Sequence, residues 1–208
     1  LIFLSFFQDT EAVTVLEFGD KPEEDAKLDV NIELPTSFSL CFQIYLMQHT
    51  KKFAPLLQFG EETIMFSLIT EDFNNPSWLI LFDTPYSFVI NEDILELYQW
   101  TGVCLSVRET TFDIFMKGLK VGLGQRVDTI LTNVILLKSL KFEPSIRYKM
   151  TNINFWSQAL SDQEMKRLTK QCNVSEFLKE KIIFELDSLD KVLEKLQSAT
   201  MIEETSQE

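Results

Sequence analysis

Short stretches of alternating apolar and polar residues, rich in Phe, Ile, Val and Thr, recur along most of the chain. Alternation with a period of two is typical of β-strands that bury one face. The pattern predicts strands at Val13–Phe18, Leu28–Leu34, Ser37–Leu46, Ile64–Thr70, Trp78–Asp83, Trp100–Val107, Thr111–Met116 and Asn133–Leu137. Turn-forming residues such as Asn74-Asn75-Pro76 and Lys117-Gly118 separate them. Many short strands of this kind pack as two layers, which predicts an all-β, antiparallel two-sheet jelly-roll sandwich.

Helical patterns come late in the chain. Ser161-Asp162-Gln163-Glu164 has the spacing of a capping box and predicts a short helix from Asp162 to Lys170. Between Lys181 and Gln197, apolar residues recur at intervals of three and four, which predicts a helix docked on its own domain through Leu186, Leu189 and Leu193, with self-association through this stripe as the alternative. The segment Ile182-Ile183-Phe184 fits a strand equally well. We therefore expect a C-terminal extension at 174–208 that is either a helix or a final strand.

Two cysteines lie in the middle of predicted strands, Cys41 within Ser37–Tyr45 and Cys104 within Trp100–Val107. A strand and hairpin turn follow at Phe112–Gly118, and Met150–Met165 reads as a strand, a tryptophan and a capped helix. This order resembles the pentraxin family and its laminin G-like and concanavalin A-like relatives, across 13–172. The resemblance implies a secreted jelly-roll sandwich with a short helix on one face, and we expect one domain at 13–173.

The resemblance also implies a disulfide between Cys41 and Cys104, which would restrict the unfolded chain. The residues themselves leave open the alternative that both are buried free thiols. Cys172 is the odd cysteine. In a secreted chain it would pair beyond Glu208 or in another subunit, unless it stays a free thiol.

The residues that bind calcium in pentraxins have few counterparts in this chain. Pentraxins hold calcium through an Asp-Asn pair after the second core strand and a Glu-Gln-Asp cluster in a long later loop. This chain has Gly60-Glu61-Glu62-Thr63 at the first place, and at the second the loop Lys138–Arg147 with Glu143 as its carboxylate. Calcium takes about six to eight oxygen ligands. We therefore expect no metal site and no cofactor, with a single weak ion on Glu61, Glu62 and Glu143 as the alternative.

Charge and composition narrow the function further. Of the 208 residues, 32 are acidic and 19 basic, and the formal charge of −13 disfavours binding to nucleic acid or anionic lipid. A single histidine, His49, excludes zinc sites built on several histidines. Against this acidity, four cations form a local basic group that is a candidate contact for a sulfated or sialylated glycan: Lys138, Lys141, Arg147 and Lys149. If the neighbouring strands share a rim, Lys117, Lys120 and Arg126 would join this group, and scattered solvated lysines are the alternative.

Three further features bear on processing. Residues 1–12 begin with the apolar run Leu1–Phe7 and resemble the remnant of a signal peptide, with an exposed apolar strand as the alternative. No other apolar run approaches the roughly 18 residues that a membrane span requires. Asn173-Val174-Ser175 is an N-glycosylation sequon that lumenal passage would expose to modification at Asn173.

These observations predict a non-enzymatic extracellular binding module, lectin-like or pattern-recognising, within a larger secreted or cell-surface protein. Its contacts would lie in the loops Gln48–Lys52, Glu61–Glu62 and Lys138–Arg147, and its partner would be a glycan or a protein. An adhesion or assembly domain without a small ligand is the alternative. A remote alternative is a glycoside hydrolase that uses Glu185 and Asp187, because alternate residues of a strand share one face.

Overall fold

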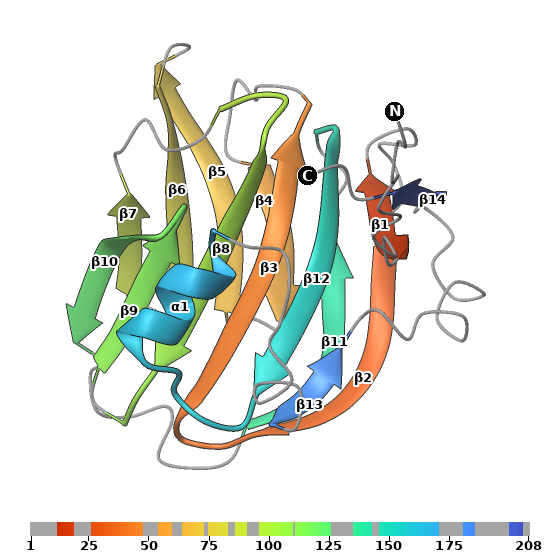
Figure 1. The fold of residues 1–208 in the computed structure, drawn as a ribbon. Helices are drawn as coiled ribbons and strands as arrows, with labels where there is room; N and C mark the ends of the chain where they lie inside the picture. The colour runs from red at the N-terminus through yellow and green to blue at the C-terminus, as the bar shows by residue number, and fades with distance from the viewer. Residues whose placement is uncertain are drawn as a thin grey trace, which may run out of the picture.

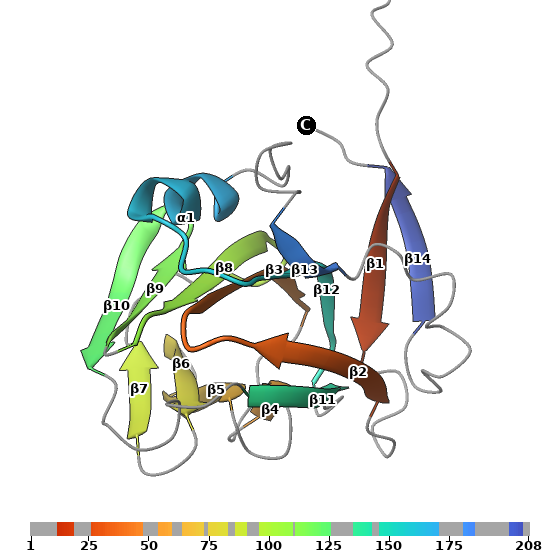
Figure 2. The ribbon, with the colours of Figure 1, turned by 90° about the horizontal axis from the view of Figure 1, so that it is seen from below.

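The computed structural model consists, in the residues it describes, of two packed antiparallel β-sheets and a short helix (Figure 1). The described residues are 12–18, 26–47, 54–59, 64–72, 75–82, 86–90, 96–109, 111–125, 135–142, 146–170, 181–185 and 200–205. Figure 2 shows the two layers in cross-section, with the helix on the outside of one sheet. The jelly-roll sandwich expected from the strand pattern is confirmed.

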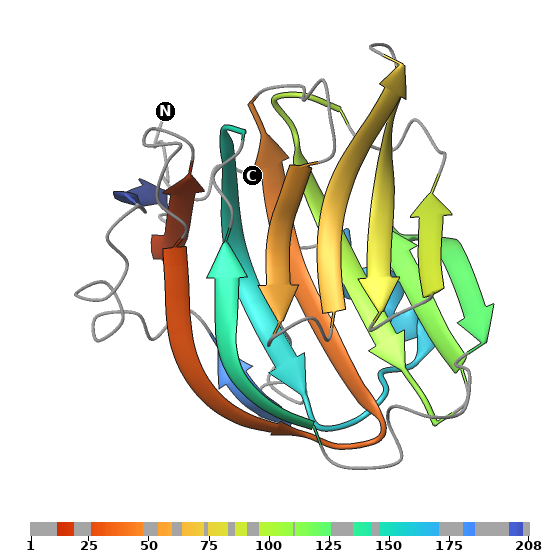
Figure 3. The same ribbon diagram turned by 180° about the vertical axis from the view of Figure 1, so that it is seen from behind.

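We call the sheet that carries the helix sheet A. Its strands in spatial order are β10 (Leu119–Gln125), β9 (Thr111–Met116), β8 (Trp100–Val107), β3 (Phe38–Leu46), β12 (Tyr148–Trp156), β1 (Ala12–Phe18) and β14 (Thr200–Thr205), with β13 (Ile182–Glu185) also paired to β12. Sheet B, which faces the viewer in Figure 3, has the order β2 (Ala26–Leu34), β11 (Ile135–Phe142), β4 (Ala54–Phe59), β5 (Ile64–Asp72), β6 (Asn75–Phe82) and β7 (Tyr86–Ile90). The helix α1 spans Asp162–Leu168.

The main hydrophobic core lies between the two sheets. Alternate residues of β3 and β8, such as Leu40, Phe42 and Leu105, are buried in it, which is the physical origin of the period-two pattern. Where β1 approaches β11, the Phe18 ring stacks on Phe142 with centroids 4.8 Å apart and on Tyr148 at 4.9 Å. The residues of β3 and β8 that alternate with these core positions point to the outer face of sheet A, away from sheet B.

The helix α1 covers part of that outer face and buries a second, smaller cluster beneath it. Members of the cluster come from the sheet, from α1 and from the segment before the helix: Cys41, Cys104, Phe115, Trp156, Leu160, Met165 and Leu168. The capping box is confirmed, since the Glu164 amide donates to Ser161 Oγ and the Ser161 amide donates to Glu164 Oε2 at 2.7 Å. The helix ends at Leu168 rather than Lys170 because Thr169 is its C-cap. Within the described ranges, no helix has the length and apolarity that a membrane crossing needs.

The strand β11 corrects the expectation of a loop at Lys138–Arg147. The strand continues to Phe142, and its register shifts between Leu137 and Ser139 where it pairs with β2. This shift breaks the simple alternation, which is why the segment reads as irregular from its sequence. Both Leu140 and Phe142 remain fully buried in the core.

The C-terminal extension contributes strands to sheet A. The strand β13 pairs with β12 and β14 pairs with β1, so Ile182 belongs to a strand and not to the expected helical stripe. Leu186, Leu189 and Leu193 lie outside the described residues. The strands β4, β7 and β10 were not predicted: the proline in β4 and the glycines in β10 weaken their strand pattern.

Candidate functional site

The four cations that are close in the sequence lie on opposite faces of the sandwich. Lys138 is exposed and Lys141 half-buried on β11, on the outer face of sheet B. Arg147 and Lys149 lie on the outer face of sheet A, where both approach Glu17. The chain crosses from one sheet to the other between β11 and β12. The single basic group expected from the sequence is therefore not formed.

The expected convergence with the β9–β10 hairpin is also wrong. In sheet A, β10 is separated from β12 by β9, β8 and β3. Lys117 Nζ lies 3.0 Å from Glu96 Oε1, and Lys120 Nζ lies 2.7 Å from Asp113 Oδ1. These lysines pair with acids instead of extending a positive rim. Arg126 lies outside the described residues.

Cys41 and Cys104 form the disulfide that the resemblance implied. They are directly paired residues of β3 and β8, with Cα atoms 4.1 Å apart. Both sulfurs point to the outer face of sheet A, into the cluster beneath α1, and Cys41 and Cys104 are 6% and 1% exposed. The bridge therefore joins two strands of one sheet and is covered by the helix.

Beyond the C-terminal end of α1, the outer face of sheet A carries a line of four side chains from four adjacent strands. Trp100 pairs with Tyr45, Tyr45 with Lys149, and Lys149 with Glu17. We call these four residues the cross-strand row. Adjacent strands lie about 4.8 Å apart, so the row is about 14 Å long. It lies at the end of the sheet where β3 ends and β8 and β12 begin, at the top of Figure 1.

Tyr98 extends the aromatic end of the row. Its ring is edge-on to Tyr45 at a centroid distance of 6.5 Å, and the Trp100 ring is tilted against Tyr45 at 5.4 Å. Tyr98 is 63% exposed. Its backbone has φ of 62°, in the left-handed region that a tyrosine rarely adopts. The Tyr98 amide donates to the Leu46 carbonyl oxygen at 2.8 Å, which ties this conformation to β3.

The other end of the row is charged. Lys149 Nζ lies 5.8 Å from the centroid of the Tyr45 ring and 4.0 Å from Glu17 Oε2. Arg147 Nη2 donates to Glu17 Oε1 at 2.9 Å. Two cations and one carboxylate thus lie together at this end of the row. The row therefore places charged groups at one end and aromatic rings at the other.

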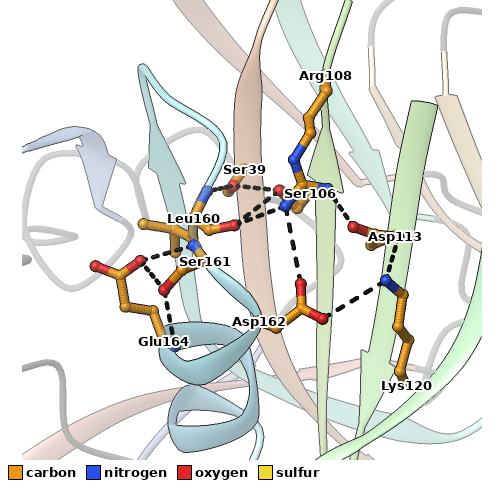
Figure 4. A network of polar contacts seen from close by, with 9 residues as sticks. All are labelled: Ser39, Ser106, Arg108, Asp113, Lys120, Leu160, Ser161, Asp162 and Glu164. Carbon is orange, nitrogen blue, oxygen red and sulfur yellow. Dashed lines mark hydrogen bonds and ion pairs between the residues drawn. The ribbon is translucent and has the colours of Figure 1, made fainter. Parts of the chain in front are cut away.

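A separate polar network surrounds the start of α1 (Figure 4). The Leu160 amide donates to Ser39 Oγ at 2.8 Å, and Ser106 Oγ and Arg108 Nη2 both donate to the Leu160 carbonyl oxygen at 3.3 Å. Asp113, which is 3% exposed, accepts from Arg108 and Lys120. The hydrogen bond to Asp113 raises the pKa of Lys120 above 10.5, against a smaller opposing effect of burial. This network fastens α1 to sheet A.

Most of the other candidate residues lie outside the described part of the chain. They are Asn173, Cys172, His49, Glu61, Glu62, Glu143 and Asp187. Glu185 is the last residue of β13 and is paired with Asn154 of β12. Among the described residues, no group of three or more His, Cys, Asp or Glu side chains is arranged to hold a metal.

Sequence reasoning missed the cross-strand row. The alternation does place Tyr45 and Trp100 on the solvent side of their strands, since their neighbours Ile44 and Thr101 are buried. Only the register brings Tyr45, Trp100, Lys149 and Glu17 into one line, and these residues are distant in the sequence.

Solved structures resemble this chain in fold, although no family model matches its sequence and no curated protein matches it significantly. A heptameric SAP-like pentraxin from Limulus polyphemus has 11% sequence identity and a TM-score of 0.62, over 93% of both chains. The binding domain of botulinum neurotoxin serotype D has 12% identity and a TM-score of 0.60, over 76% of this chain and 42% of that one. A Trypanosoma rangeli sialidase in complex with sialic acid has 13% identity and a TM-score of 0.52, over 69% of this chain and 26% of the enzyme. The chain therefore has the jelly-roll fold of the pentraxins and of related concanavalin A-like binding domains.

Proposed function

We propose that this chain is a non-enzymatic extracellular binding module, lectin-like or pattern-recognising, in a larger secreted or cell-surface protein. The observation that carries the proposal is the cross-strand row with Tyr98, where aromatic rings and charged groups meet on the outer face of sheet A. Exposed aromatic side chains beside charged groups are typical of binding surfaces.

The carboxylates near α1 and near the row support a binding role over catalysis. Asp113 and Asp162 pair with Arg108 and Lys120. Glu17 pairs with Arg147 and Lys149, and Glu96 pairs with Lys117. A hydrolytic pair of carboxylates needs one acid held protonated and one ionised. Here each of these carboxylates is held in an ion pair with a lysine or an arginine.

The structural neighbours support the same class of function. The pentraxin matches this chain over nearly its whole length, and the toxin domain is by name a binding domain. An extracellular location is supported by the disulfide, because such bridges persist in oxidising compartments.

We propose in addition that binding does not require calcium. The segment in which the pentraxin resemblance places the later calcium loop contains a single carboxylate, Glu143, and residues 138–142 of it belong to the strand β11. Calcium takes about six to eight oxygen ligands, several of them carboxylates.

A glycan array, read once with calcium and once with a chelator, tests the proposal. We expect the same glycans to bind under both conditions. We also expect millimolar calcium to leave the melting temperature unchanged, because an ion that binds only the native state would raise it. Binding that disappears with the chelator would overturn the calcium claim. An array without any bound glycan would overturn the lectin-like function and favour the adhesion or assembly alternative.

A further inference from the structure

We infer that Tyr98, Trp100 and the ion pair between Glu96 and Lys117 form a calcium-independent site for a neutral pyranose, a sugar ring without an ionised group. The inference rests on the proposed function, for which it names the ligand class and the contact residues. Tyr98 lies in the turn before β8, and Trp100 is the first residue of that strand. Both rings lie against Tyr45 on the outer face of sheet A.

Tyr45 supports the two rings that are offered to the sugar. On one side, Lys149 Nζ of β12 lies 5.8 Å from the centroid of the Tyr45 ring, and on the other side the Trp100 ring of β8 lies at 5.4 Å. The planes of Tyr45 and Trp100 are tilted by 53°, and Tyr98 meets Tyr45 edge-on at 71°. Tyr45 thus holds two rings in place without stacking face to face on either.

The conformation of Tyr98 is an independent observation that points to a ligand. Its φ of 62° costs on the order of 1 kcal/mol or more, and outliers of this kind concentrate at functional sites. The hydrogen bond from its amide to the Leu46 carbonyl oxygen holds this conformation, and the residue stays 63% exposed. Folding gains little from a strained residue whose ring remains in water, because the hydrophobic effect rewards burial. Contact with a ligand gives the exposed ring a role.

The two rings match the apolar face of a sugar. A pyranose presents C–H groups on the face of its ring and hydroxyl groups around its edge. Tyrosine and tryptophan likewise combine a flat apolar ring with one polar group. Trp100 is half-buried, so its position is fixed while part of the side chain remains accessible beside Tyr98.

The ion pair next to the rings supplies groups that bind hydroxyls. Glu96 Oε1 lies 3.0 Å from Lys117 Nζ, and these side chains are 53% and 29% exposed. Glu96 is two residues before Tyr98, and the Lys117 amide donates to the carbonyl oxygen of Gly102 in β8. A carboxylate accepts hydrogen bonds and an ammonium group donates them, so the pair can bind a hydroxyl in either sense.

The charges favour a neutral sugar over an ionised one. Glu96 and Lys117 neutralise each other, so an ionised ligand has to compete with an existing ion pair, whereas a hydroxyl can join it. The whole chain carries a formal charge of −13, which repels an anionic sugar further.

The size of the site favours a sugar over a protein partner. A stable protein interface uses about 20–30 residues on each side. Here the Tyr98 and Trp100 rings both lie within 6.5 Å of the Tyr45 ring. A patch of this size suits one or two sugar units.

Saturation-transfer NMR and titration calorimetry of the whole chain, both in the presence of a chelator, test the inference. The probes are lactose, cellobiose and maltose, with 3′-sialyllactose as the anionic comparison. We expect at least one neutral disaccharide to bind, with saturation strongest at the C–H protons on one face of a sugar ring. 3′-Sialyllactose should bind no more tightly than the best neutral probe.

Four variants locate the site, and the melting temperature of each verifies folding. Tyr98→Ala should weaken the best neutral probe about tenfold, whereas Tyr98→Phe keeps the ring and should stay within about threefold of wild type. Glu96→Gln removes the acid that pairs with Lys117 and should raise the affinity for 3′-sialyllactose about threefold relative to the neutral probe. Leu136→Ala is the matched control, because it removes an apolar side chain that is 50% exposed on β11 of the other sheet, and it should change nothing.

The outcomes separate this inference from the function beneath it. If the array shows bound glycans but no neutral disaccharide binds, or if Tyr98→Ala binds like Leu136→Ala, the inference fails while the lectin-like function stands. If 3′-sialyllactose binds more tightly than every neutral probe, the selection of a neutral sugar is wrong. If neither the array nor any probe shows binding, the proposed function fails and the inference fails with it.

Discussion

Asp113 is the residue on which the docking of α1 depends most directly. Its carboxylate is buried on the outer face of β9 and is held by Arg108 and by Lys120, which lies 2.7 Å away (Figure 4). Both cations also approach Asp162 in the first turn of the helix, at 3.9 and 3.6 Å. Asp113 thus fixes two cations that in turn attract the start of α1.

We expect Asp113→Asn to lower the free energy of unfolding by about 2 kcal/mol, because hydrogen bonds to a charged group are lost at a buried position. Urea denaturation measures the change. Asp162→Asn is the control, since this side chain is 53% exposed and its contacts are longer, and it should cost less than about 1 kcal/mol. Equal losses in the two variants would contradict the central role of Asp113.

The raised pKa of Lys120 predicts how the free energy of unfolding changes with pH. Asp113 raises the pKa of this lysine in the folded state above 10.5. Its contribution to stability is therefore complete below 10.5 and is lost as the pH rises through the raised pKa. The difference in the free energy of unfolding between wild type and Lys120→Gln should be constant near pH 8 and should shrink at more alkaline pH. Urea denaturation at each pH measures this difference. Lys166→Gln controls for general alkaline effects, and a difference that grows with pH would refute the assignment.

At the scale of elements, α1 is docked by a close approach of backbone to backbone. A Cβ atom at Gly102 would lie 2.6 Å from the carbonyl oxygen of Thr169 and 2.8 Å from its Cα. The Thr169 hydroxyl accepts from the Gly118 amide at 2.8 Å and donates to Met165. The C-terminal end of the helix therefore sits directly on β8 and on the β9–β10 turn, and only glycine fits beneath it at position 102.

We expect Gly102→Ala to displace the end of α1 and to cost about 1–3 kcal/mol of overpacking strain. Hydrogen exchange at the Met165 and Thr169 amides should speed up, since both bond within this helix. Gly118→Asn is the matched comparison: the three atoms nearest to its new Cβ belong to the flexible Lys170 side chain instead of the backbone, and asparagine tolerates the φ of 77°. A larger effect at Gly118 would contradict docking through Gly102.

At the scale of the whole molecule, the disulfide closes a loop that contains β4, β5, β6 and β7 of sheet B. Cys41 and Cys104 are separated by 63 residues, and the bridge joins the two central strands of sheet A that flank this loop. The link therefore restricts a large part of the unfolded chain while joining strands that are already paired.

Replacing both cysteines by alanine should lower the free energy of unfolding by about 4 kcal/mol in the chain-entropy model for a loop of this length. Guanidinium denaturation with and without a reductant measures the effect. The reductant should destabilise the wild type and leave the double variant unchanged, which is the internal control. The prediction is wrong if the free energy of unfolding of the wild type stays the same once the unfolded chain has been exposed to the reductant.

The sequence determined the features that depend on neighbouring residues. Strand periodicity identified β1, β2, β3, β5, β6, β8 and β9, and the Ser161–Glu164 spacing identified α1 with its capping box. Local patterns suffice here because alternation reports burial of one strand face, and a cap is formed within four residues. The resemblance, rather than periodicity, supplied the pairing of Cys41 with Cys104.

The tertiary structure alone decided which distant residues lie side by side. Lys141 and Arg147 are close in the sequence but lie on opposite outer faces, because the chain changes sheets between β11 and β12. Glu17, Tyr45, Trp100 and Lys149 are distant in the sequence but form one line, because strand order and register place them opposite one another. Ile182 joins a strand because β12 offers it unpaired backbone groups beyond the reach of β1. Pairing of this kind joins residues far apart in the chain, whereas turn type and loop length fix the register only within a hairpin.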